Sequence, residues 1–176
     1  MRKINKISLY LLTATLLPFL FLFGCTSHSG RLLQVPADLK IAVLTGGIAP
    51  GQPVLKLEID AQGNCVYYES RGIDKAAALF RQIEAFKIPP EGMYYIYKTI
   101  MTNDFSGLSP QYINKQVLDG NFAKLTVTEN NRTHTVRTQN IKVARFDKIM
   151  IAINVCTPGM NKVIYNQISW FTDARD

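Results

Sequence analysis

Alternating apolar and polar residues predict a β-hairpin early in the chain. In Val54–Asp60, leucine and isoleucine occupy every second position and charged residues lie between them, which is typical of a strand with one buried face. Residues 61–63 end in glycine and can turn the chain into a second strand, Cys65–Glu69. This three-residue loop would pair Ile59 with Cys65 and point the cysteine into the core. A two-residue turn would shift the register by one and point Cys65 outward, and the sequence leaves both open.

A second hairpin is predicted further along the chain. Its strands, Phe122–Thr128 and Thr133–Thr138, are joined through Asn130-Asn131, and asparagine tolerates the positive φ of a two-residue turn. This register places apolar residues on one face and threonines on the other, as in a sheet with one wet face. The predicted cross-strand pairs are Leu125 with Val136, Thr126 with Thr135, Val127 with His134, Thr128 with Thr133, and Glu129 with Arg132.

Two segments have the spacing of amphipathic helices. In Asp74–Phe86 and in Ala144–Cys156, apolar residues recur every three or four positions, which places them on one side of a helix. Met93–Met101 fits either a helix or a strand, because its apolar spacing favours the first and its β-branched and aromatic content the second. Residues 103–116 have the composition of a loop, and Lys162–Phe171 can add a last strand.

These elements predict an α+β fold with an antiparallel sheet of about 4–6 strands in two hairpins and two helices on one face. The strand-like segment Leu39–Thr45 belongs to the same sheet. In this arrangement Cys156, at the end of the second helix, can reach Cys65 on the side of the sheet that faces the helices. We therefore expect a disulfide between these two cysteines, with two buried free thiols as the alternative.

The first residues have the pattern of a targeting signal. Three basic residues among the first six precede an apolar stretch, Ile7–Phe23, which is the order of a secretory leader. The stretch leads into Leu22-Phe23-Gly24-Cys25, which resembles the bacterial lipobox. This resemblance implies that Cys25 is diacylated and becomes the new N-terminus. A plain signal peptide or an uncleaved anchor is the alternative, although the stretch is short for a bilayer span.

The leader divides the chain into three parts. Residues 1–24 form the signal peptide, residues 25–37 the lipidated cysteine and a flexible tether, and residues 38–176 a single globular domain. The acyl chains on Cys25 would hold the protein to a lipid bilayer. The expected location is the bacterial cell envelope, with the domain outside the cytoplasm and the choice between inner and outer membrane left open.

The charge does not favour nucleic acid as a partner. The 176 residues include 20 Lys+Arg and 13 Asp+Glu, which gives a formal charge of +7. Removal of the leader takes away Arg2, Lys3 and Lys6 and lowers this charge to +4. We therefore expect no nucleic-acid binding from this mildly basic domain.

Sequence motifs for catalysis and for metal or cofactor binding are absent. The chain lacks the H-E-x-x-H, G-x-S-x-G, S-x-x-K, P-loop and C-x-x-C signatures. His134 is the only histidine after the tether, and its apolar neighbours favour a structural role. Glu58 and Asp60 share one face of a strand, so a cell-envelope hydrolase that uses carboxylates is the enzyme alternative. The prediction is a non-catalytic domain without a cofactor.

The segment Gly46–Pro53 is the candidate partner-binding loop. It contains three glycines and two prolines, and proline lowers the entropy lost when a loop becomes ordered on binding. A long hairpin connection without a binding role is the alternative. The residues predicted to contact an extracytoplasmic protein or protease are Gly46, Gly47, Ile48, Pro50, Gly51 and Pro53.

The order of the elements resembles a known group of inhibitors. A strand leading to Gly46-Gly47, two further strands, a helix, a hairpin that carries Thr133-His134-Thr135-Val136-Arg137 and a closing helix are similar to the small bacterial emfourin-type inhibitors of thermolysin-like metalloproteases. The similarity covers residues 38–156. It implies a domain that inhibits a protease. From the residues themselves we expect a membrane-tethered lipoprotein domain that acts by contact with another protein.

Overall fold

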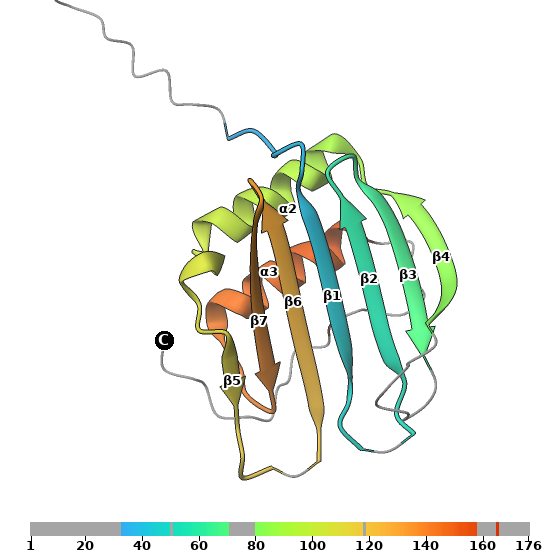
Figure 1. Ribbon diagram of the computed structural model, residues 1–176, viewed down its shortest axis with the longest axis vertical. Helices are drawn as coiled ribbons and strands as arrows, with labels where there is room; N and C mark the ends of the chain where they lie inside the picture. Colours follow the sequence, from blue (N-terminus) through green and yellow to red (C-terminus); the bar gives the residue numbers. More distant parts are fainter. Residues whose placement is uncertain (1–32, 50, 71–79, 118, 158–164, 166–176) are drawn as a thin grey trace, which may run out of the picture. The chain divides into compact units, whose positions relative to one another are not determined.

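The computed structural model describes residues 33–49, 51–70, 80–117, 119–157 and 165. In this part of the chain it confirms an α+β fold with a mostly antiparallel sheet and two helices (Figure 1). The elements, in chain order, are β1 (Lys40–Gly47), β2 (Val54–Asp60), β3 (Asn64–Ser70), β4 (Arg81–Lys87), α2 (Pro90–Thr102), the 3-10 turn η2 (Phe105–Gly107), β5 (Gln111–Ile113), β6 (Asn121–Glu129), β7 (Arg132–Gln139) and α3 (Ala144–Cys156).

The sheet has seven strands in the order β4-β3-β2-β1-β6-β7-β5, which is more than the four to six expected. All neighbours are antiparallel except β5 and β7, which run parallel. Ile59 pairs with Cys65 across the first hairpin, which decides between the two registers that the sequence left open. The predicted register of the second hairpin is confirmed, with Val127 opposite His134. Strand β1 lies between β2 and β6 and so joins the two hairpins into one sheet.

Both helices lie on the same face of the sheet (Figure 1). The apolar stripe of α3 is buried as predicted, since Phe146, Ile149 and Ile153 have no exposed surface. The ambiguous segment 93–101 is helical and lies within α2. Pro90 occupies its first turn, where the missing N–H is harmless and the fixed φ suits a helix. The core between the layers combines these stripes with inward residues of the central strands, such as Leu57 and Leu125.

The predicted helix over Asp74–Phe86 is wrong for the residues that the structure describes. Residues 81–87 form β4, and residues 71–79 lie outside the described part. Glu84 and Phe86 are half-buried while Ile83 and Ala85 are exposed, so burial alternates with a period of two. The reason is tertiary: β4 pairs with β3 and satisfies backbone groups that would otherwise be left at the edge of the sheet.

Two further expectations concern residues 103–116 and the end of the chain. The segment 103–116, expected to be a loop, contains η2 and the short strand β5. A last strand over Lys162–Phe171 lies outside the described residues except for Tyr165. Tyr165 is buried, and its hydroxyl donates a hydrogen bond to Asp147 of α3.

The two cysteines are free thiols, so the predicted disulfide is not formed in this structure. Cys65 is buried in β3, and burial raises the pKa of its thiol to about 12. Cys156, at the end of α3, lies beside the start of α2, with Sγ 3.5 Å from the carbonyl oxygen of Gly92. Burial raises the pKa of Cys156 as well. Both thiols therefore stay protonated at neutral pH, and pairing of the two stays a prediction.

The predicted leader, the lipidation site Cys25 and the tether as far as residue 32 lie outside the described residues. No helix in the part of the chain that is described has the length and apolar character needed to cross a membrane. The described chain enters the domain through a turn in which Leu39 N–H donates to the Pro36 carbonyl oxygen at 3.1 Å.

Candidate functional site

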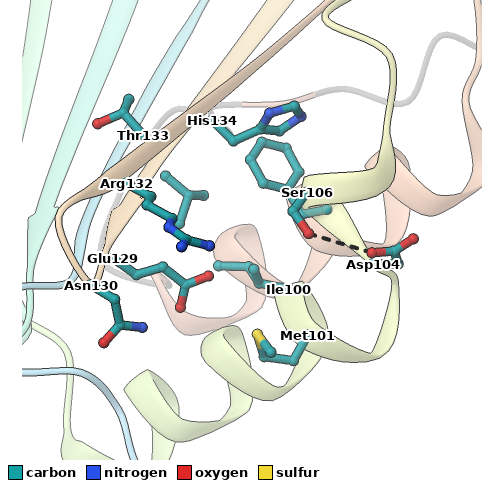
Figure 2. Close-up of a pocket in the computed structure, with 11 residues that line it drawn as sticks. Ile100, Met101, Asp104, Ser106, Glu129, Asn130, Arg132, Thr133 and His134 are labelled. Carbon is teal, nitrogen blue, oxygen red and sulfur yellow. Dashed lines mark hydrogen bonds between the residues drawn. The ribbon is translucent and has the colours of Figure 1, made fainter.

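A pocket of about 490 Å³ lies between the end of α2 and the β6–β7 hairpin (Figure 2). Residues from far apart in the sequence meet here, because η2 follows α2 directly and the hairpin pairs β6 with β7 beside it. The lining residues are Ile100, Met101, Asp104, Phe105, Ser106, Val127, Glu129, Asn130, Arg132, Thr133 and His134.

The inner lining of the pocket is apolar. Ile100, Phe105 and Val127 are each at most 3% exposed. Asp104 turns the chain from α2 into η2 with a φ of 45°, a left-handed conformation that aspartate tolerates better than most residues. This turn places Phe105 inward. The result is a preformed apolar surface able to receive an apolar group.

The hairpin tip that forms one wall is held in place from outside the hairpin. Asn130 and Asn131 adopt the positive φ values, 49° and 59°, that the sequence predicts for this turn. Their backbone N–H groups donate to the carboxylate of Asp38, at 3.0 and 2.8 Å. These two bonds, that from Asn131 first, lower the pKa of Asp38 below its ordinary value. The segment before β1 therefore fixes the tip and the pocket wall that it carries.

Charged side chains line the hairpin side of the pocket. Glu129 and Arg132 are opposite each other across the turn, and both extend into the pocket (Figure 2). Glu129 Oε2 accepts a hydrogen bond of 2.8 Å from the hydroxyl of Tyr97 on α2. Burial, and then this bond, raise the pKa of Tyr97 to about 12. The bond joins α2 to the hairpin.

The opposite side is built around Asp104. Its carboxylate lies 3.5 Å from the hydroxyl of Ser106 and 3.5 Å from a guanidinium nitrogen of Arg145 on α3. Two of these residues, Asp104 and Ser106, line the pocket, while Arg145 approaches from the neighbouring helix. The lining of the pocket thus combines buried apolar residues with charged groups of both signs.

His134 bonds to a backbone group and packs against a neighbouring aromatic ring. Its Nε2 lies 3.1 Å from the carbonyl oxygen of Leu108, so Nε2 carries the proton and donates it to that oxygen. The ring packs edge-to-face on Phe105, with centroids 5.2 Å apart. These contacts join η2 to β7, and they match the structural role that the sequence favours.

The candidate loop Gly46–Pro53 lies elsewhere and is shorter than predicted. Gly46 and Gly47 belong to β1, which continues two residues further because β6 pairs with it as far as Asn121. Ile48 N–H donates to the Gly120 carbonyl oxygen at 2.7 Å. Gly51 and Pro53 are exposed, and residue 50 lies outside the described residues. Because β1 begins beside Thr128 and ends beside Asn121, this loop and the pocket lie at opposite ends of the strand.

The two carboxylates proposed for a hydrolase have other partners. Glu58 forms an ion pair of 2.6 Å with Lys56 on the same strand. Asp60 accepts bonds from the backbone N–H groups of Gln62 and Asn64, both at 2.9 Å, and from the Asn64 side chain. Burial raises the pKa of Asp60, but these bonds outweigh it and lower the pKa overall. Asp60 therefore stabilises the β2–β3 turn.

No protein-family model matches the chain, and the search of curated proteins found no match. Within the described residues, no group of three histidine, cysteine or acidic side chains is close enough to hold a metal ion. The function must therefore be inferred from the geometry of the pocket and its surroundings.

Sequence reasoning found only part of this site. The Glu129–Arg132 pair and the position of His134 followed from the hairpin pattern, whereas the contributions of α2 and η2 did not. Two features mark the α2 side of the pocket. Asp104 has a positive φ after a helix, and Met101 is an exposed apolar residue beside it.

Proposed function

We propose that the protein is a membrane-tethered extracytoplasmic lipoprotein whose domain binds another protein through this pocket, without catalysis. The observation that carries the proposal is the preformed apolar pocket, together with exposed apolar side chains on α2, the helix that forms one of its walls. Met101 lines the pocket and is 47% exposed. Tyr94 and Tyr95, about two turns earlier on the same helix, are 41% and 48% exposed.

The composition of this surface supports protein binding. Tyrosine, methionine and arginine are enriched in protein interfaces, and an apolar centre with a polar rim is the usual arrangement. Here Met101 and the two tyrosines supply apolar area, and Arg132 and Asp104 are charged residues of the pocket lining. The partner we expect presents an apolar side chain to the pocket interior, with charged groups beside it.

Polar groups of the pocket are held in place by bonds to the protein itself. His134 donates to a backbone carbonyl, and Asp104 lies between Ser106 and Arg145. Side chains fixed in this way give the pocket a preformed wall, which lowers the ordering cost of binding.

The tether is tested separately from the pocket. The full chain produced in bacteria should be found in the membrane fraction, with a mass that shows loss of residues 1–24 and diacylation of Cys25. Cys25→Ser should leave the leader uncleaved. An unmodified wild-type chain in the soluble fraction would contradict the lipoprotein proposal.

The binding site is tested by photo-crosslinking in native membranes. A photoreactive amino acid at Ser106, an exposed residue of the pocket, should give one discrete protein adduct. Met101→Asp and Arg132→Glu should each reduce that adduct severalfold. Lys148→Glu, an exposed change on α3, is the matched control and should leave it unchanged. Equal adducts in all variants would contradict a role for the pocket.

A further inference from the structure

The face of the sheet away from the helices carries a row of basic residues. The strand pairings place Lys56 of β2 beside Leu44 of β1, Leu44 beside Lys124 of β6, and Lys124 beside Arg137 of β7. With strands about 4.8 Å apart, the row crosses roughly 14 Å of the sheet. Its neighbours along each strand, such as Leu125 and Val136, are buried, so these side chains point away from the core.

Two of these positive charges are opposite each other without an acidic partner. Lys56 forms its ion pair with Glu58, but no carboxylate among the described residues bonds Lys124 or Arg137. Arg137 donates to the Gln139 side chain at 2.9 Å. Like charges at directly opposed positions of an antiparallel pair destabilise a sheet. An external anion would remove this repulsion.

Apolar and aromatic groups accompany the basic row. The Arg137 guanidinium lies over the ring of Phe122, at 5.3 Å, and the Lys56 ammonium lies over Tyr68, at 5.2 Å. Gly46 lies between Val54 and Phe122 of the neighbouring strands. A Cβ added at position 46 would come within 3.3 Å of both side chains, so these two residues lie close together. These half-buried apolar residues therefore form a continuous surface beside the charges.

We propose that this face binds the anionic head groups of a phospholipid membrane. The surface of a bilayer presents phosphate groups that can bind the cations. Just below them lies an apolar layer that can receive the side chains of Phe122 and Leu44. The inference rests on the proposed tether. Ten residues, 26–35, separate Cys25 from the turn that begins at Pro36, enough for roughly 33 Å of extended chain, so the face can reach the bilayer that holds the acyl chains. Tethering also raises the local concentration of the face at that surface.

The test uses the full chain in lipid nanodiscs of phosphatidylcholine alone or with phosphatidylglycerol. A photoreactive amino acid at Gln111, the exposed neighbour of Arg137 on β5, should form lipid adducts mainly in the anionic discs. The same amino acid at Lys148 on α3 should form few in either. Because the apolar leader holds even an unprocessed chain in the disc, a failure of lipidation at Cys25 and a failure of this proposal are read separately.

Lys124→Glu separates binding from folding. It places a carboxylate opposite Arg137, so the melting temperature should stay the same or rise, while adducts in the anionic discs should fall by at least about fivefold. Lys98→Glu, an exposed change on α2, is the control and should alter neither. Equal adducts in the two kinds of disc would overturn the proposal. So would a protein adduct at Gln111 in native membranes that Lys124→Glu abolishes, because the face would then bind an acidic protein.

Discussion

Replacement of Gly63 tests the edge of the sheet that the sequence did not predict. Gly63 has a φ of 80° in the turn between β2 and β3, and its carbonyl oxygen accepts a 2.8 Å hydrogen bond from Ile88 N–H. Ile88 directly follows β4, so this bond fixes the end of β4 to the turn. A Cβ at position 63 would overlap with the carbonyl oxygen of Ile88.

The matched control is Gly51, which has almost the same φ, 83°, but no atom within 4 Å of an added Cβ. Gly51→Ala should lower the free energy of unfolding only by the cost of a left-handed backbone conformation at alanine, about 1 kcal/mol. Gly63→Ala adds the overlap and weakens the bond to Ile88, which together cost about 2 kcal/mol more. We therefore expect about 3 kcal/mol of destabilisation for Gly63→Ala against about 1 kcal/mol for Gly51→Ala.

The assay is equilibrium unfolding of the two variants and the wild type under the same conditions. A difference of about 2 kcal/mol corresponds to a melting temperature lower by roughly 6 °C for Gly63→Ala than for Gly51→Ala. If residues 81–87 were helical, as the sequence pattern suggests, the bond from Ile88 would not exist and the two variants should unfold alike. Equal stabilities would refute the assignment of β4.

Three further outcomes are expected. Tyr97→Phe removes the bond to Glu129 and should cost about 1 kcal/mol of stability, whereas Tyr94→Phe on the exposed side of α2 should cost nothing measurable. Burial raises the pKa of Cys65 from 9.0 to about 12, so the unfolded chain loses this proton first. Stability should therefore fall as the pH rises from 9 towards 12, and native Cys65 should resist alkylation at neutral pH until the chain is unfolded. If the resemblance to emfourin-type inhibitors extends to function, the protein should slow a thermolysin-like protease at micromolar concentration, and shortening of residues 48–53 should abolish the effect; no slowing would contradict inhibition.

The two hairpins were predictable because their information is local. Alternation fixes which face of β2 is buried, and Asn130-Asn131 fixes the turn and therefore the register of β6 on β7. The left-handed conformation that both asparagines adopt is the one that this residue type tolerates. The second helix followed from its apolar stripe in the same way.

The rest depends on contacts between distant segments. In β4 the apolar residues happen to fit a helical period, and only pairing with β3 makes the segment a strand. Gly46 and Gly47 have loop composition, but β2 and β6 pair with β1 on both sides and extend it past Thr45. The pocket joins α2 to the hairpin across nearly thirty residues of sequence, so no local pattern contains it.

The central claim is that the pocket beside the β6–β7 hairpin is the binding surface for a protein. Its most direct test is amide hydrogen exchange of the membrane-held chain, alone and in complex with the protein captured by crosslinking from Ser106. We predict slower exchange in the complex at the end of α2 and in η2, residues 100–107, and at the hairpin tip, residues 128–134. Protection confined to residues 48–53, or to the helix-free face of the sheet, would contradict the account.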